Sequence, residues 1–478
     1  MSAAGIPLAL SYDDVLLAPR RSAIRSRSDV DVATRLTRGL RLAVPIVSAN
    51  MDTVTESEMA VAMARAGGIG IIHRFLSVED QVTEVARVKR AEALVIADPH
   101  TIGPDVPLAE ALEAMARNGV TTLVVTDDDG RLEGMLTRRD VGPWPDGAVA
   151  VRDVMTPRDR LVTGGPATSS EQATAMLRQA RVEKLPLVDA QGRLAGLITL
   201  RDLITRSERP YATKDERGRL AVGAAIGVRG DFIERAQALV DAGADVLVLD
   251  IAHGHTESAL AALGDVREAI GDRAGLIAGN VATAEGARDL AEAGADAVKV
   301  GVGPGSVCTT RVVAGVGVPQ LSAVMECAEA CAPLGVPVIA DGGIRAGGDV
   351  AKAIAAGAET VMVGNLLAGT PESPGVAVTR NGTLVKVFRG MASEAAATAR
   401  RALEDDDTEF TPVVAEGVEA VVPLRDAVAD VLHGLVGGLR SGMSYSNAST
   451  IPEFHRNARF VRITPGGLRE SYPHDVSY

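Results

Sequence analysis

Three stretches of this 478-residue chain repeat one pattern: AGADVLVLD (242–250), AGADAVKVG (293–301) and AAGAETVMVG (355–364). Each begins in an alanine-rich helical segment, turns at Gly-Ala and continues into a short run rich in β-branched residues. GLIAGNVA (275–282) and GVPVIADGG (335–343) supply further strands of the same kind. Strands that alternate with helices in this way form parallel sheets. The number and even size of the units predict an α/β fold, a closed (β/α)8 TIM barrel.

Polar residues follow these predicted strands at their carboxyl ends. They are Asp250, Asn280, the loop 301–311, Asp341 and the pair Gly364-Asn365. In a (β/α)8 barrel the carboxyl ends of all strands converge on one face, where active sites form. We therefore expect the functional site on that face.

A second repeat is formed by GRLEGMLTRRDV (130–141) and GRLAGLITLRDL (192–203), each after an apolar strand. Both copies contain Thr-x-x-Asp, in which the threonine is expected to cap the next helix. The pair resembles a tandem CBS (Bateman) module. The resemblance implies a regulatory purine nucleotide, ATP or GTP, between the repeats. The residues implied to contact it are Thr137, Asp140, Thr199 and Asp202.

These patterns predict two domains. Residues 97–207 would form the tandem CBS regulatory domain, with GPWPDG (142–147) as its internal connector. Residues 1–95 and 210–478 would form the catalytic barrel into which it is inserted.

Composition argues against several classes of partner. The net charge is -13 and there is no basic block, so neither nucleic acid nor an anionic membrane is an expected partner. We find no signal peptide and no uncharged apolar run of about 18 residues. Three cysteines in a chain of this length do not form a disulfide framework. A cytoplasmic location is expected.

One cysteine stands in a loop suited to chemistry. GVGPGSVCTTR (301–311) places Cys308 among glycines and hydroxyls, where backbone N–H groups can surround an exposed thiolate. Cys327 and Cys331 are spaced by four in MECAEACAP, which predicts that they pack on one face of a helix.

VGVGPGSVCTTR (300–311) resembles the active-site loop of the IMP dehydrogenase/GMP reductase family. The resemblance extends along nearly the whole chain, and the CBS insertion also matches the family. Other matching motifs include SYDDVLLAPRRS (11–22), SANMDTVTE (48–56), GGIGIIHR (67–74), IADGGIR (339–345), RGMAS (389–393), GGLRSGMSY (437–445) and LRESYPHDV (468–476).

The resemblance implies a purine nucleotide substrate. Cys308 would attack C2 of its base to form a covalent adduct. The other implied contacts are Ser306, Gly342, Gly343, Gly364 and Asn365 to the 5′-phosphate, Asp341 to the ribose, and Gly390 and Met391 to the base. The family usually has tyrosine where Phe388 stands, so the resemblance does not carry over the phosphate hydrogen bond of that tyrosine.

The resemblance also implies a nicotinamide cofactor, a monovalent cation and an oligomer. Asp250, Asn280 and Gly301 would face the nicotinamide. The backbone carbonyls of Gly303, Gly305 and Cys308 would bind K+, completed by Glu470, Ser471 and Tyr472 of a neighbouring subunit. The implied assembly is a homo-tetramer or octamer.

The direction of the reaction depends on whether water is activated. Dehydrogenases of the family use an Arg-Tyr pair on a flap to hydrolyse the adduct, but the flap here (393–416) has no tyrosine. Asn50-Met51 and the helix MECAEA also look like the reductase. We therefore favour NADPH-dependent GMP reductase, in which Thr310 and Glu416 would protonate the departing ammonia.

Several alternatives stay open. GVGVPQ, GGIRAGGD and the CBS insertion look like IMP dehydrogenase, in which Arg401 of the Arg400-Arg401 pair, before the acidic run 404–407, would activate water. A non-catalytic nucleotide sensor is the alternative of another class. Weaker candidates are a Schiff-base lyase at Lys299 and a metal pair at His253 and His255.

Overall fold

The computed structural model describes residues 5–92, 94–96, 98–141, 149–396, 398 and 414–473. The chain divides into two compact units: Met1–Ala91 with Tyr211–Tyr478, and Glu92–Pro210. The connector 142–147, the flap pair Arg400-Arg401 and the acidic run 404–407 lie outside the described residues.

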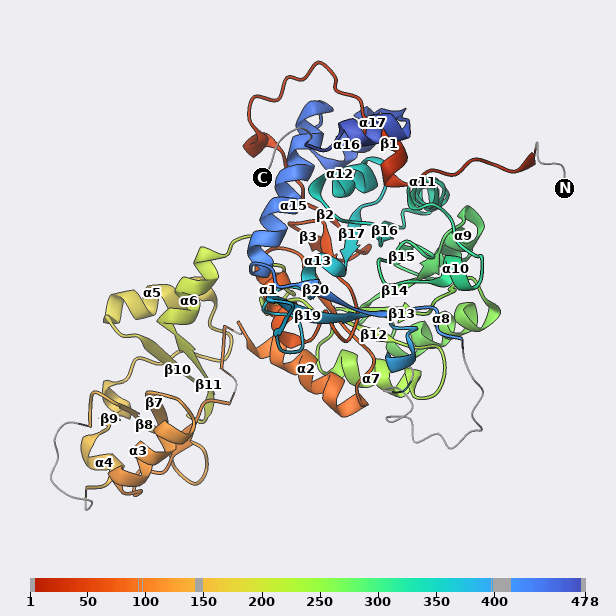
Figure 1. The fold of residues 1–478 in the computed structure, drawn as a ribbon. Helices are drawn as coiled ribbons and strands as arrows, with labels where there is room; N and C mark the ends of the chain where they lie inside the picture. The colour runs from red at the N-terminus through yellow and green to blue at the C-terminus, as the bar shows by residue number, and fades with distance from the viewer. Residues whose placement is uncertain are drawn as a thin grey trace. The chain divides into compact units, whose positions relative to one another are not determined.

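The first unit is a closed barrel of eight parallel strands, in the order β12-β13-β14-β15-β16-β17-β4-β5 (Figure 1). The prediction of a (β/α)8 barrel is confirmed. Two pairings close the ring: Val361 of β17 lies opposite Ile46 of β4, and Gly223 of β12 lies opposite Ile71 of β5. The strands are β4 (Ile46–Ser48), β5 (Ile69–Ile72), β12 (Gly223–Ile226), β13 (Val246–Asp250), β14 (Gly275–Val281), β15 (Ala297–Val300), β16 (Val338–Asp341) and β17 (Thr360–Val363).

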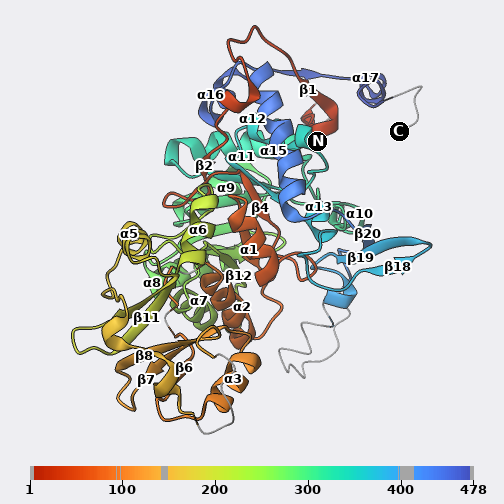
Figure 2. The same ribbon diagram turned by 90° about the vertical axis from the view of Figure 1, so that its left-hand side faces the viewer.

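Helices follow the strands and cover the outside of the barrel (Figures 1 and 2). The long C-terminal helix α15 packs against α12 and α1, which completes the outer layer after β17. The helices are α1 (Ser57–Arg65), α2 (Val78–Arg90), α7 (Phe232–Asp241), α8 (Glu257–Ile270), α9 (Ala284–Glu292), α11 (Gln320–Cys331), α12 (Gly347–Ala355) and α15 (Val428–Tyr445).

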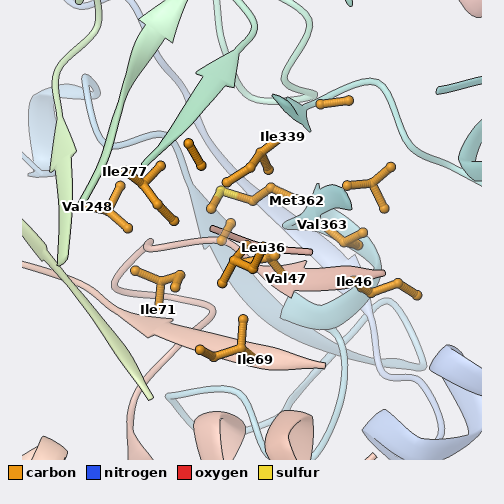
Figure 3. Close-up of a cluster of buried hydrophobic side chains, with 14 of the residues drawn as sticks. Leu36, Ile46, Val47, Ile69, Ile71, Val248, Ile277, Ile339, Met362 and Val363 are labelled. Atoms are coloured by element: carbon orange, nitrogen blue, oxygen red, sulfur yellow. The ribbon is translucent and has the colours of Figure 1, made fainter. Parts of the chain in front are cut away.

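The barrel strands are apolar on both faces because the helices cover one face and the barrel interior covers the other. Figure 3 shows buried isoleucine, valine and methionine side chains from several strands in one cluster, joined by Leu36. Ile46, Ile69, Ile277 and Ile339 are fully buried. This close-packed interior fixes the strands that carry the polar residues at their carboxyl ends.

Smaller elements surround the barrel. A three-stranded antiparallel sheet follows the short helix α13 (Asn365–Ala368), and two two-stranded sheets involve the N-terminal segment. The elements are β1 (Val15–Leu17), β2 (Thr34–Arg35), β3 (Arg41–Leu42), α10 (Thr310–Val313), β18 (Val378–Arg380), β19 (Thr383–Arg389), β20 (Glu419–Pro423), α16 (Ile451–Asn457), β21 (Phe460–Arg462) and α17 (Pro465–Glu470).

The second unit is built from two similar halves, each with an antiparallel hairpin. Thr122 pairs with Thr137 in one hairpin, and Lys184 pairs with Thr199 in the other. The halves also pair with each other, because the Leu132 N–H donates to the Gly192 carbonyl and the Leu194 N–H to the Gly130 carbonyl. The elements are β6 (Thr101–Ile102), α3 (Leu108–Arg117), β7 (Thr122–Thr126), β8 (Leu132–Thr137), α4 (Val151–Val154), β9 (Thr156–Pro157), α5 (Ser170–Ala180), β10 (Lys184–Val188), β11 (Leu194–Thr199) and α6 (Leu200–Glu208).

The two Thr-x-x-Asp motifs of this unit differ in structure. Thr199 caps α6, as predicted, with its hydroxyl accepting the Asp202 N–H at 3.2 Å. The cap predicted at Thr137 is wrong for the described residues, which form a turn there. The Thr137 hydroxyl donates to the Asp140 carboxylate at 2.8 Å, and the Thr199 hydroxyl makes the same contact with Asp202.

Among the helices of the described ranges, none combines the length and apolar character that a bilayer span requires.

We predict that Gly70→Ala destabilises the barrel. A Cβ at Gly70 on β5 would lie 2.5 Å from the Cα of Ala60 on α1, so the helix backbone must move. Overpacking of this kind costs about 1–3 kcal/mol. The measurement is the midpoint of urea unfolding followed by circular dichroism.

The matched control is Gly264→Ala in the middle of α8, where no atom other than the neighbouring residues and backbone of the same helix lies within 4 Å of the added Cβ. There alanine should stabilise the protein by about 0.5–1 kcal/mol, since glycine is the poorer helix former. Equal midpoints for the two variants would contradict the packing at Gly70.

Candidate active site

Four polar side chains meet at the carboxyl ends of adjacent strands β13 to β16. The Lys299 ammonium lies 2.8 Å from Oδ1 of Asp250 and 2.8 Å from Oδ2 of Asp341. It also donates to Oδ1 of Asn280, whose Nδ2 donates to Asp341 at 2.9 Å and to the Gly301 carbonyl at 2.8 Å. The predicted convergence of Asp250, Asn280 and Asp341 is therefore present, with Lys299 at its centre.

Burial and charge compete in this cluster. Burial lowers the pKa of Lys299, but attraction to the Asp250 and Asp341 carboxylates outweighs it and holds the pKa above its ordinary value. Burial raises the pKa of Asp250, but the Lys299 ammonium outweighs it and the pKa lies below its ordinary value. A protonated, ion-paired ammonium is not a nucleophile, so the geometry argues against a Schiff-base lyase at Lys299.

Cys308 lies in a tight turn after β15, with its side chain partly exposed. Its N–H donates to the Gly305 carbonyl at 3.1 Å, and its sulfur lies 3.2 Å from the Thr310 hydroxyl. Gly301 permits the turn into this loop, because it has φ +154° and an added Cβ would lie 2.1 Å from the Asp341 carbonyl oxygen. The loop thus presents thiol and hydroxyl together at the strand ends.

Two later segments of the chain pair with the cysteine loop. The Thr309 N–H donates to the Glu416 carbonyl at 2.9 Å, and the Val418 N–H donates to the Val307 carbonyl at 3.0 Å. The Glu416 N–H in turn donates to the Ala392 carbonyl at 3.1 Å, which adds the RGMAS segment with Gly390 and Met391. Cys308, Thr310, Glu416 and Met391 are therefore brought together from three parts of the sequence.

The glycine segments predicted to hold a phosphate border the same loop. A Cβ on Gly342 would lie 2.8 Å from the Pro304 side chain and 3.2 Å from the Gly305 nitrogen, beside the exposed Ser306. A Cβ on Gly364 would lie 3.4 Å from the Met51 sulfur and 3.6 Å from the Phe388 ring. Gly343 adjoins Gly342 and Asn365 begins α13.

The remaining predicted positions are placed as follows. The Gly305 carbonyl of the expected cation site accepts the Cys308 N–H, and the Arg311 side chain lies against Gly303. Glu470 is the last residue of α17, Ser471 and Tyr472 follow it, and Tyr472 is 56% exposed. His255 lies 2.8 Å from the Asp289 carboxylate, and its ring centre is 6.4 Å from that of His253.

Sequence reasoning missed three contacts that shape the site. Arg389 pairs with Asp52, with Nε 2.8 Å from Oδ2, which ties the loop after β4 to the RGMAS segment. Asn50 hydrogen-bonds the Asp250 carboxyl. The third is the pairing of Lys299 with Asp250 and Asp341, since the sequence of the apolar strand AVKVG suggests this lysine only as a Schiff-base candidate.

Residues 9–474 match the IMP dehydrogenase / GMP reductase domain, which is nearly the whole chain. The chain belongs to this family. Inosine-5′-monophosphate dehydrogenase from Nitrosopumilus maritimus is 51% identical over 475 residues, which cover 98% of each chain. GMP reductase from Leishmania major is 50% identical over 482 residues, which cover 99% of this chain and 98% of the relative. The predicted membership of the IMP dehydrogenase/GMP reductase family is confirmed.

A solved structure of a family member has the same fold. It is a cysteine-to-alanine variant of GMP reductase from Trypanosoma brucei in complex with guanosine 5′-monophosphate, with TM-score 0.92 and 47% identity over 99% of both chains. Relatives named for the two activities are about equally similar to this chain. Overall identity therefore does not separate the two activities, and the assignment of this chain to dehydrogenase or reductase depends on the residues of the site.

We predict that only Cys308 reacts with iodoacetamide in the native protein at pH 8. Cys327 and Cys331 pack on one face of α11 and are fully buried, as expected. Burial raises the pKa of Cys327 to about 12 and that of Cys331 to about 11, which leaves little thiolate to react. Mass spectrometry of the peptides measures the labelling.

Unfolding in urea is the control, because all three thiols should then be alkylated. Native labelling of Cys327 at the rate of Cys308 would contradict the described burial.

Proposed function

We propose that the chain is a GMP reductase, which converts GMP to IMP and ammonia with NADPH as the reductant. The observation that carries this proposal is the 3.2 Å contact between the Cys308 sulfur and the Thr310 hydroxyl, beside the Glu416 segment. The sequence adds that the flap lacks the Arg-Tyr pair that would activate water. The chain therefore offers a nucleophile and a proton relay without the expected base for hydrolysis.

In the proposed mechanism the Cys308 thiolate adds to C2 of GMP. The C2–N bond then breaks, and ammonia leaves with a proton delivered through Thr310 and Glu416. Such a relay is needed because an amine leaves well only when it is protonated. When bound, NADPH would supply the hydride that C2 receives. Cys308 would then leave as the thiolate as the C2–sulfur bond breaks and IMP is released.

Other residues of the chain would orient the ligands. Asp341 would bind the ribose hydroxyls, since its Oδ2 is held by Lys299 and Asn280 and Oδ1 remains on the other side of the carboxylate. Asp250, Asn280 and Gly301 would face the nicotinamide. The phosphate would be held by backbone N–H groups and hydroxyl or amide side chains of Ser306, Gly342, Gly343, Gly364 and Asn365, as such groups bind phosphates elsewhere.

The finer parts of the proposal concern the cofactor and regulation. They are NADPH rather than NADH, K+ at the carbonyls of the cysteine loop, a homo-tetramer or octamer, and a cytoplasmic location. The second unit would be the CBS domain, with ATP or GTP at Thr137, Asp140, Thr199 and Asp202. The pairing of its two similar halves supports a nucleotide site between them.

IMP dehydrogenase is the second candidate, because a relative with that name is 51% identical. Absorbance of the reduced nicotinamide at 340 nm, followed in two separate reactions, distinguishes the reductase from the dehydrogenase. Loss of signal with GMP and NADPH, with IMP and ammonia formed, establishes the reductase. A gain with IMP, NAD and K+, with XMP formed, establishes the dehydrogenase and makes Arg401 the first residue to mutate. No change in either, with ATP and GTP added, favours a nucleotide sensor.

We predict that Cys308→Ala abolishes turnover, because no adduct can form. Thr310→Val should slow the release of ammonia by about 10²- to 10⁴-fold, the usual contribution of a positioned acid or base. Thr310→Ser keeps the hydroxyl and is the matched control, with a rate within about tenfold of the unmodified enzyme. Stopped-flow measurement of ammonia release in a single turnover tests this. A fully active Cys308→Ala variant would overturn the covalent mechanism.

A further inference from the structure

Lys299 is a buried lysine for which the proposed chemistry has no direct use. Its side chain is 3% exposed, and its ammonium contacts the carboxylates of Asp250 and Asp341 and the amide oxygen of Asn280. An ammonium has three donors, so these contacts use all of them. Lys299 is therefore bonded only to residues assigned to the two ligands.

The two carboxylates held by Lys299 serve different ligands. Asp341 would bind the ribose of the nucleotide, whereas Asp250 would face the nicotinamide. Each has an oxygen 2.8 Å from the same nitrogen, so these oxygens lie no farther apart than twice that distance. Without the ammonium, two like charges this close repel each other, and they separate or share a proton.

We propose that Lys299 is a positioning residue that fixes the ribose-binding carboxylate of Asp341 relative to the nicotinamide-facing carboxylate of Asp250. The purine C2 and the hydride donor are then aligned by one ammonium. This positioning role rests on the proposed function, because it concerns the reduction of GMP.

The barrel contains a second lysine that serves as a matched control. Lys89 is also buried, with its side chain 4% exposed, and bridges two carboxylates, with Nζ 3.2 Å from Asp215 and 2.6 Å from Asp245. Asp245 immediately precedes β13, and Asp250 ends the same strand. The two clusters thus have the same chemistry at opposite ends of one strand, and only that of Lys299 lies at the site.

The test compares Lys299→Met with Lys89→Met in the full-length protein. Both variants lose a buried ion pair, and both should lower the melting temperature. Lys299→Met should also raise the Kd for GMP, measured by calorimetry without cofactor, at least about tenfold. It should slow hydride transfer in a single turnover about 10²-fold, the usual effect of a misplaced reacting group. Lys89→Met should keep both values within about twofold.

A double variant keeps the test valid if Lys299→Met does not fold. Lys299→Met with Asp250→Asn removes one positive and one negative charge, so the net charge of the cluster is unchanged. The amide carries no charge, so Asp341 no longer has a like charge beside it, and GMP affinity should return to within about threefold of the unmodified protein. Hydride transfer should stay slow, because the nicotinamide side is not restored.

The outcomes separate the two proposals. If the unmodified enzyme does not oxidise NADPH with GMP, the proposed function fails. If the unmodified enzyme is active and Lys299→Met matches Lys89→Met in GMP affinity and hydride transfer, Lys299 is merely structural and its positioning role is wrong. Recovery of hydride transfer together with GMP affinity in the double variant would also overturn that role.

Discussion

Closure of the eight-stranded barrel is the constraint on which the rest of the structure depends. Each strand is short and is hydrogen-bonded to a neighbour on both sides. Closure therefore brings together residues that are far apart in the chain, such as Asn50 and Asp250. Because the interior is fully packed with apolar side chains, the polar groups can gather only at the strand ends. The chemistry of the molecule is confined to that rim.

At the rim, two kinds of force hold the site. Buried ion pairs fix the side chains, as at Lys299 with its two aspartates and at Arg389 with Asp52. Backbone hydrogen bonds fix the cysteine loop, which pairs with the segment around Glu416. Cys308 thus lies on a loop whose conformation depends on backbone hydrogen bonds to a later part of the chain. A conformational change in the segment around Glu416 would therefore move the loop that carries Cys308.

Much of the fold could be predicted because its signals are local. Each βα unit carries its own apolar strand and Gly-Ala turn, and the cysteine loop is a continuous motif. Lys299 was harder to interpret because its partners are distant in sequence, with Asp341 42 residues away. The same lysine could be a nucleophile or a counter-ion, and only the closed barrel decides. The turn after Thr137 differs from the helix after Thr199 although the two motifs are alike, so the motif alone does not fix the element that follows.

The place of the second unit in the chain order has a consequence for chain entropy. Residues 92–210 leave the barrel after α2 and return before β12, and β12 is hydrogen-bonded to β5, the strand that precedes α2. For the barrel, the whole unit is a long loop between neighbouring strands. The entropic cost of closing a loop rises only with the logarithm of its length, by about 0.6 kcal/mol for each doubling. A complete folded module can therefore be carried at this position with little effect on the stability of the strands that hold the site.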